Sequence, residues 1–140
     1  MRILIVEDEA LLALELEYEI EAAGHEVLAQ APSYKAALEV IDRDKPDFAF
    51  VDIHLIDGPR GVDVGYYLSR SHIPFVFVTG NVRRIPEDFA GALGVIEKPY
   101  TMNGLQNALS YIDDLIRGIS PAEPPPGLAL PPSVPSDRKG

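Results

Sequence analysis

Five side chains that can take part in phosphoryl chemistry follow apolar stretches of the sequence. They are Glu7, Asp8, Asp52, Thr79 and Lys98. Carboxylates brought close together repel one another unless a cation lies among them, and hard divalent ions such as Mg²⁺ suit such a cluster. One carboxylate could then attack phosphorus, while an ammonium group and a hydroxyl bind the phosphoryl oxygens. This chemistry requires a fold that gathers all five side chains at one point.

Asp52 is the first candidate for the nucleophile because of the stretch that precedes it. The apolar run 48–51 leads directly into this acid, and turn-forming residues follow at 57–59. An unbroken apolar run predicts a strand that is covered on both faces, as in a parallel sheet. Ligands of open α/β sheets bind at the carboxyl ends of the strands, which is where Asp52 would lie.

The rest of the chain alternates between short apolar runs and helix-forming segments. Strands are predicted over 2–6, 26–31, 48–52, 75–78 and 94–97. Helices are predicted over 9–23, 34–43, 62–71, 87–90 and 102–117, the fourth being a short helix that starts at Pro86 after a loop-rich segment. This pattern indicates an α/β fold of the (βα)₅ type, with one parallel sheet and helices on both faces. The five candidate side chains would then share one edge of the sheet.

The first predicted helix carries two apolar stripes. The first stripe consists of Leu12, Leu16, Ile20 and Ala23. The second consists of Leu11, Leu14, Tyr18 and Ala22. We expect the first stripe to pack on the sheet. For the second stripe we favour burial in the core over a role as a surface that docks a partner.

Composition excludes several classes of protein. With 140 residues, of which 46% are hydrophobic, the chain can form one domain with its own core. Its net charge of −10 argues against direct contact with nucleic acid, which needs a basic face. Without cysteine there is no disulfide or thiolate chemistry. No apolar run approaches the ~20 residues of a membrane span, and the N-terminus lacks a signal-peptide core, so we expect a cytoplasmic protein without membrane insertion.

The end of the chain differs from the rest. Seven of the last twenty residues are proline, so this part cannot build a core of its own. We therefore expect a domain over 1–118 and an extended or disordered proline-rich tail over 119–140.

Four short motifs resemble the receiver domain of two-component response regulators, which is the CheY-like family. The motifs are Ile-Val-Glu-Asp at 5–8, Val-Asp-Ile-His-Leu at 51–55, Val-Thr-Gly at 78–80 and Glu-Lys-Pro at 97–99. Their order and spacing fit the family over about residues 1–118. The resemblance implies a flavodoxin-like three-layer fold with five parallel strands in the order 2-1-3-4-5.

The resemblance also implies a role for each site residue. Asp52 would accept a phosphoryl group from a phosphohistidine on a histidine kinase or a histidine phosphotransfer protein. Thr79 and Lys98 would bind that group. Mg²⁺, or Mn²⁺ in its place, would be held by Glu7, Asp8, Asp52 and the main-chain carbonyl of His54.

Four further residues beside the acceptor are predicted to modulate it. They are His54, Gly80, Asn81 and Pro99. In the family such positions tune the lifetime of the phosphoryl group, and the alternative for His54 and Asn81 is that both are solvated loop residues. The Lys98–Pro99 peptide is expected to be cis, as receivers usually have it.

The sequence departs from the common receiver pattern in two places. Val95 stands where an aromatic residue usually switches on phosphorylation, and Ile56 stands where a proline is common. The segment 74–81 resembles a subgroup of stand-alone receivers with a Pro-Phe-x-Phe-x-Thr-Gly fourth strand. That subgroup switches by reordering the segment after this strand.

We therefore expect a single-domain response regulator, because only a short tail follows residue 118. It would signal by phosphorylation-dependent binding to a downstream protein whose identity the sequence does not give, or act as a phosphate relay or sink. It would catalyse only its own phosphorylation and dephosphorylation, and would not otherwise be an enzyme. The resemblance leaves a homodimer through the last helix open.

Two other classes of function remain as alternatives. A Mg²⁺-dependent phosphatase or phosphotransferase with an aspartyl nucleophile usually has a second acid two residues after that nucleophile, where this chain has His54. A nucleotide- or flavin-binding module usually has a glycine-rich first loop, where this chain has acids.

Overall fold

The strands of the protein form one sheet, in which five neighbours run parallel. The computed structural model describes residues 1–119 and 123–131. The parallel strands are β1 (Arg2–Val6), β2 (Glu26–Ala31), β3 (Phe48–Asp52), β4 (Phe75–Thr79) and β5 (Gly94–Glu97). Their order across the sheet is β2-β1-β3-β4-β5. The predicted α/β fold and strand order are confirmed.

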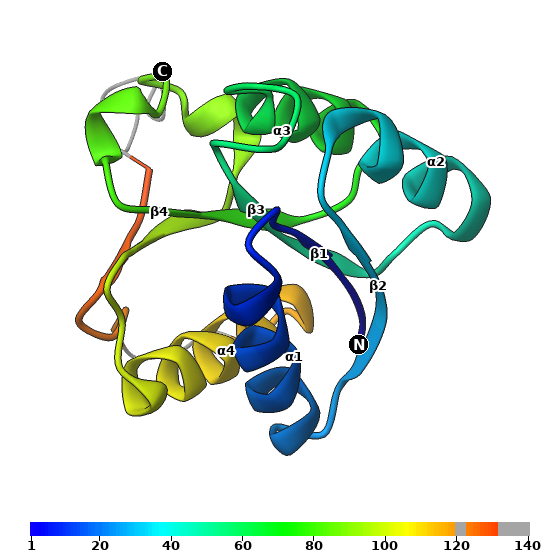
Figure 1. Cartoon of the computed structure of the whole chain (residues 1–140). Coiled ribbons are helices and arrows are strands. Elements are labelled where there is room, and N and C mark those ends of the chain that lie inside the picture. Colours follow the sequence, from blue (N-terminus) through cyan, green and yellow to red (C-terminus); the bar gives the residue numbers. More distant parts are fainter. Residues whose placement is uncertain (120–122, 132–140) are drawn as a thin grey trace.

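Helices lie on both faces of the sheet (Figure 1). On one face are α1 (Ala10–Ala22) and α4 (Met102–Ile116), and on the other are α2 (Tyr34–Asp44) and α3 (Gly61–Arg70). Local sequence sets some of these ends: the Ser33 hydroxyl accepts a hydrogen bond from the Ala36 amide and so caps α2. Within the described ranges, no helix has both the length and the apolar character that crossing a bilayer demands.

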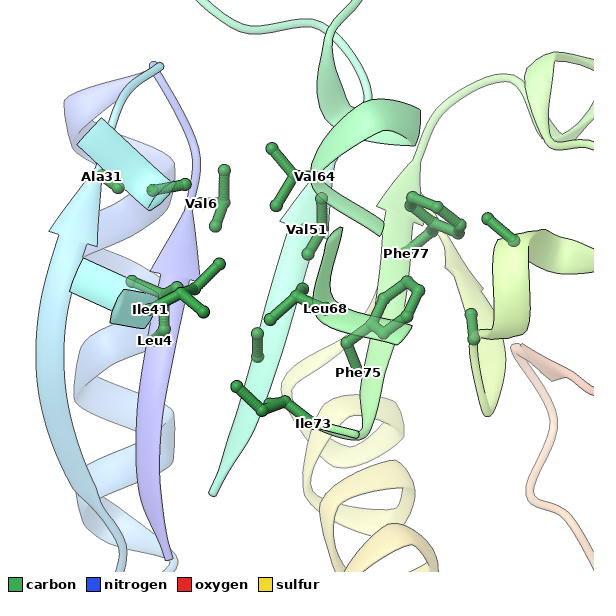
Figure 2. Close-up of a cluster of buried hydrophobic side chains, with 14 of the residues drawn as sticks. Leu4, Val6, Ala31, Ile41, Val51, Val64, Leu68, Ile73, Phe75 and Phe77 are labelled. Carbon is green, nitrogen blue, oxygen red and sulfur yellow. The ribbon is translucent and has the colours of Figure 1, made fainter. Parts of the chain in front are cut away.

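Alternate residues of the central strands enter two separate cores, which explains the unbroken apolar runs. Figure 2 shows the core under α2 and α3, where Val51 lies near Phe75 and Phe77 of the neighbouring strand. The intervening residues Phe48 and Phe50 face the other core, under α1 and α4. The strand that ends in Asp52 is therefore anchored from both sides.

The prediction of a fourth helix over 87–90 is wrong. The chain instead forms two single 3₁₀ turns, η1 (Val82–Arg84) and η2 (Phe89–Gly91). The Asp88 carboxylate accepts a hydrogen bond from the Ala90 amide, and the backbone at Phe89 and Ala90 has φ of 55° and 50°. These left-handed values stop an α-helix. The described residues thus contain four α-helices rather than the predicted five.

The structure adds a sixth strand that was not predicted. This strand, β6 (Leu128–Ala129), pairs antiparallel with β5 at the edge of the sheet. Part of the segment assigned to an extended or disordered tail is thus ordered against the domain. The remaining tail residues, 120–122 and 132–140, lie outside the described ranges, and the domain boundary at 118 stays a prediction.

The second apolar stripe of α1 lies on the surface, so its predicted burial is wrong. Leu11, Leu14 and Tyr18 are 68%, 60% and 70% exposed. The helix buries Ala13, Leu16 and Ile20, whereas Leu12 and Ala23 of the first stripe are only partly buried. A helix that packs on a single sheet buries only one side. The alternative expectation, a surface that docks a partner, is compatible with this exposure.

The connection from β3 to α3 positions Asp52 through a close main-chain contact. The Gly61 amide donates a hydrogen bond to the Ile53 carbonyl. A Cβ at position 61 would lie 2.0 Å from the main-chain oxygen of Asp52. Only glycine therefore lets the start of α3 approach the end of β3 this closely.

Gly61→Ala should destabilise the protein by about 3 kcal/mol, because the methyl group meets backbone rather than a movable side chain. The matched control is Gly80→Ala, whose added Cβ meets no atom within 4 Å and should change stability by less than about 0.5 kcal/mol. Urea unfolding measures both variants. Equal stability of the two variants would contradict the assigned contact.

Candidate active site

The five side chains singled out for phosphoryl chemistry come together at the carboxyl edge of the sheet. Glu7 and Asp8 follow β1, Asp52 ends β3, Thr79 ends β4 and Lys98 follows β5. A hollow of about 390 Å³ opens there. Its lining consists of Asp8, Glu9, Asp52, His54, Thr79, Gly80, Asn81 and Lys98. Glu7 is buried, at 7% exposed, but one of its carboxylate oxygens lies within 4.8 Å of oxygens of Asp8 and Asp52.

Lys98 joins two of the acids. Its Nζ lies 3.2 Å from Oε1 of Glu7 and 3.2 Å from Oδ2 of Asp52. The Asp52 residue is itself only 8% exposed, so the ammonium group compensates charge that water reaches poorly. The two charge-assisted hydrogen bonds tie the ends of β1, β3 and β5 to one another.

Asp52 is held by its own main chain as well. Its Oδ1 accepts a hydrogen bond of 2.7 Å from the Ile53 amide, while Oδ2 faces Lys98. Both carboxylate oxygens are therefore oriented. Asp52 also pairs in register with Val78 of β4, which places Thr79 one residue further along the neighbouring strand.

The site changes the acidity of two of its groups. Burial raises the pKa of Glu7 to about 7, and the nearby Asp52 charge adds to this effect, although the hydrogen bond from the Glu9 amide opposes it. Burial alone would lower the pKa of Lys98, but the charges of Asp52 and Glu7 outweigh it and raise that pKa. The amine therefore stays charged at neutral pH, whereas Glu7 is poised to exchange a proton.

The three acids suit a hard divalent cation. Glu7, Asp8 and Asp52 each offer one carboxylate oxygen, and these oxygens lie within 4.8 Å of one another. Oxygen ligands of this kind match Mg²⁺ or Mn²⁺. Burial, with a smaller contribution from the Asp52 charge, raises the pKa of Glu7, and a bound cation would oppose this effect by favouring the ionised carboxylate. Asp8 is exposed, so an ion could enter from solvent.

The polar residues after β4 form a local network. Thr79 is only 2% exposed, and its hydroxyl accepts a hydrogen bond of 3.1 Å from the Asn81 amide. The Asn81 side chain accepts from the Arg83 amide and so caps η1. Gly80 has open space around its Cα. The network connects the site directly with η1.

The remaining predicted residues are placed as follows. His54 is exposed and lines the hollow, and its main-chain carbonyl as a metal ligand stays a prediction. The Lys98–Pro99 peptide is cis, as expected. The modulating roles of His54, Gly80, Asn81 and Pro99 also stay predictions.

Two main-chain donors and one neighbouring surface escaped the reasoning from sequence. The amides of Glu9 and Ile53 orient the acids, and main-chain donors leave no mark in residue types. A second hollow of about 400 Å³ adjoins Lys98 on the side of α1. Its other lining residues are Leu12, Glu15, Pro99, Tyr100 and Met102. The aromatic residue directly after Lys98-Pro99 was the one available signal for it.

Comparison with known proteins identifies the family. The family model described as the response regulator receiver domain matches residues 3–110. The chain belongs to the response regulator receiver family. The resemblance inferred from the four motifs is thereby confirmed, whereas membership of the subgroup with the Pro-Phe-x-Phe-x-Thr-Gly strand stays a prediction.

Several known receivers are similar to this one. The phyllosphere-induced regulator PhyR of Methylorubrum extorquens is 37% identical over 84 residues, which is 59% of this chain but 32% of that protein. The response regulatory domain of protein mrkE from Klebsiella pneumoniae has a TM-score of 0.77 at 27% identity, covering 84% of this chain and 99% of the other. PhyR from Brucella abortus has a TM-score of 0.71 at 28% identity, covering 83% and 50%.

Family membership establishes the general role of this receiver. Receivers are signalling proteins of two-component systems, act with kinases or phosphotransfer proteins, and bind Mg²⁺ through an acidic pocket. This chain has an acidic cluster of Glu7, Asp8 and Asp52 at the carboxyl edge of its sheet. Because this chain spans only about a third of the PhyR relative, the activities of that whole protein do not follow for it.

Glu7→Gln should abolish a pH dependence of stability in the metal-free receiver. The pKa of Glu7 is raised from 4.5 to about 7, so the folded state binds this proton more tightly than the unfolded state. The free energy of unfolding should therefore fall by about 3 kcal/mol as the pH rises from about 4.5 to about 7. Urea unfolding in EDTA across this range measures it.

The control for this prediction is Glu21→Gln, on the exposed side of α1, which should keep the slope of the parent protein. Mg²⁺ should flatten the slope of the parent by favouring ionised Glu7. A Glu7→Gln variant with an unchanged pH dependence would show that another group is responsible.

Proposed function

We propose that Asp52 accepts a phosphoryl group, in a Mg²⁺-dependent reaction, from the phosphohistidine of a histidine kinase or phosphotransfer protein. The observation that carries this proposal is the bridge from Lys98 to both Glu7 and Asp52. The bridge supports the proposal because the buried Asp52 carboxylate is held in one orientation with an ammonium group beside it. The open hollow above Asp52 leaves space for the incoming phosphoryl group.

The reaction follows from these positions. A carboxylate oxygen of Asp52 attacks phosphorus, a P–O bond forms, and the P–N bond to the donor imidazole breaks with its electron pair returning to nitrogen. The Lys98 ammonium then binds a phosphoryl oxygen in place of the carboxylate oxygen it contacted before. The Thr79 hydroxyl donates to a second phosphoryl oxygen.

Glu7 and Asp8, together with Asp52, would hold the cation. A bound Mg²⁺ supplies positive charge that offsets the negative charge of the phosphoryl oxygens. For this the proton that Glu7 holds near neutral pH must leave, which links metal affinity to the raised pKa of that residue. His54 and Asn81 lie at the rim of the hollow, where they would control the approach of water and thus the lifetime of the acyl phosphate.

The signal would leave through the segment after β4. Val95 stands in the place of the usual aromatic switch residue. It is 1% exposed and packs in the same core as Ile85 and Ala90, so it is already buried and cannot move inward as an exposed aromatic side chain would. Thr79 instead bonds to Asn81, which caps η1. A change at Thr79 would therefore reorder η1 and η2. The outcome would be binding to a downstream protein, or transfer onward as a relay or sink.

Asp52→Asn should abolish labelling by acetyl phosphate in the presence of Mg²⁺, because the amide is no nucleophile toward phosphorus. Phosphate-affinity electrophoresis and intact-protein mass spectrometry measure the labelling. The control is Asp57→Asn, an exposed acid of the loop that follows β3, which should be labelled as the parent is. Stoichiometric labelling of Asp52→Asn would contradict the proposal.

The exposed stripe of α1 would dock the phosphodonor. Leu11 and Leu14 are exposed on a helix that starts beside the acids, and the hollow lined by Leu12 and Tyr100 lies between this helix and Lys98. An apolar surface at this position suits a partner that must bring a phosphohistidine to Asp52.

Leu14→Ser should slow transfer from a phosphorylated histidine phosphotransfer protein by about tenfold, through loss of apolar burial with the partner. Labelling by acetyl phosphate should not change, because the site is intact. The matched control is Leu115→Ser on α4, where the parent leucine is 37% exposed. Rapid-quench measurements with both donors test this, and equal effects of the two variants would contradict the docking assignment.

A further inference from the structure

The segment over 126–130 covers an edge of the sheet that would otherwise be open. In Figure 1 this orange segment runs alongside the end of the sheet next to β5. Ile96 pairs with Leu128 and Val95 pairs with Ala129, in antiparallel register. An edge strand offers free amide and carbonyl groups to any extended segment, and here the chain's own tail takes them.

The sequence of β5 is adapted to this neighbour. A Cβ at Gly94 would lie 2.8 Å from the main-chain oxygen of Ala129 and 2.9 Å from Cδ1 of Leu128. Glycine weakens a strand interior, and it is found where another backbone approaches closely. The edge of β5 is therefore shaped to accept a strand.

One side chain anchors the segment, and the rest of its attachment is slight. Leu128 is 7% exposed and joins the core that contains Ile96 and Leu105. Leu130, two residues on, is 38% exposed. Only two residues of the segment pair with β5, and the hydrogen bond from the Glu97 amide to the Gly127 carbonyl is long at 3.4 Å. The site that Leu128 occupies against Ile96 and Leu105, here called the Leu128 seat, is well formed. A strand of only two residues is nevertheless held weakly enough to be exchanged.

We propose that the β5 edge and the Leu128 seat form a docking site for an extended apolar segment of another protein, and that residues 126–130 are an internal competitor for it. The incoming segment would add as a strand. It needs main-chain groups that pair with β5 and approach Gly94 closely, and a leucine-sized residue for the seat. The tail sequence Gly-Leu-Ala-Leu at 127–130 has this pattern.

The docking site is connected with the candidate active site. β5 runs directly into Lys98, and a hollow beside β6 is lined by Val82 of η1 together with Val95 and Glu97. Movement of Lys98 or of η1 would therefore alter the seat of the tail. This regulatory link rests on the proposed phosphoryl transfer, whereas the docking site itself does not.

The test uses the full chain, unphosphorylated and without Mg²⁺, with Leu128→Asp to release the tail and Leu130→Asp as the matched control. The probe is a fluorescent peptide with the sequence of residues 124–131. Leu128→Asp should bind it at least about tenfold more tightly than the parent or the control, because the buried anchor no longer competes. Fluorescence anisotropy measures the affinities. Equal affinity of all three proteins, or no binding to any, would overturn the proposal.

Hydrogen exchange gives a second readout that does not depend on the peptide. The Glu97 amide should be protected in the parent and in Leu130→Asp, and should exchange at least about tenfold faster in Leu128→Asp. Protection should be independent of protein concentration. Protection that grows with concentration would mean that a second copy supplies the strand, which contradicts internal competition. Failure of these tests leaves labelling of Asp52 by acetyl phosphate unaffected, so the two proposals fail separately.

Discussion

The structure depends on the compensation of buried negative charge at the end of the sheet. Glu7 and Asp52 are each less than a tenth exposed, and an unpaired carboxylate in such surroundings is costly. The Lys98 ammonium compensates both, but it cannot balance two buried acids and the adjacent Asp8. The site is therefore short of positive charge, which accounts for its fit to a divalent cation, while burial raises the pKa of Glu7 and the Asp52 charge adds to this effect.

This arrangement is possible because the strands are parallel and held in register. β3 lies between β1 and β4, so Asp52 ends a strand that is flanked on both sides. Thr79 pairs with Glu97, which brings the hydroxyl and the following Lys98 to the same level. The two cores fix these positions from above and below the sheet. Packing far from the site thus determines distances within it.

Reasoning from sequence recovered what short-range patterns encode. Apolar runs placed the five parallel strands, and the polar residues that follow them placed the site, because parallel strands share one carboxyl edge. Reasoning from sequence failed where contacts between distant parts of the chain determine the local structure. The left-handed backbone at Phe89 and Ala90 leaves no signature in two residues that are not glycine. The exposure of Leu11 and Leu14 depends on what packs on α1, and β6 depends on the space above Gly94.

The central proposal is that the acids at the end of the sheet form a single cation site around Asp52. Anomalous diffraction from a crystal soaked in Mn²⁺ tests it most directly. The account predicts one strong peak within about 2.5 Å of carboxylate oxygens of both Asp8 and Asp52. A saturated crystal with no peak there, or with its strongest peak elsewhere on the molecule, would contradict the account.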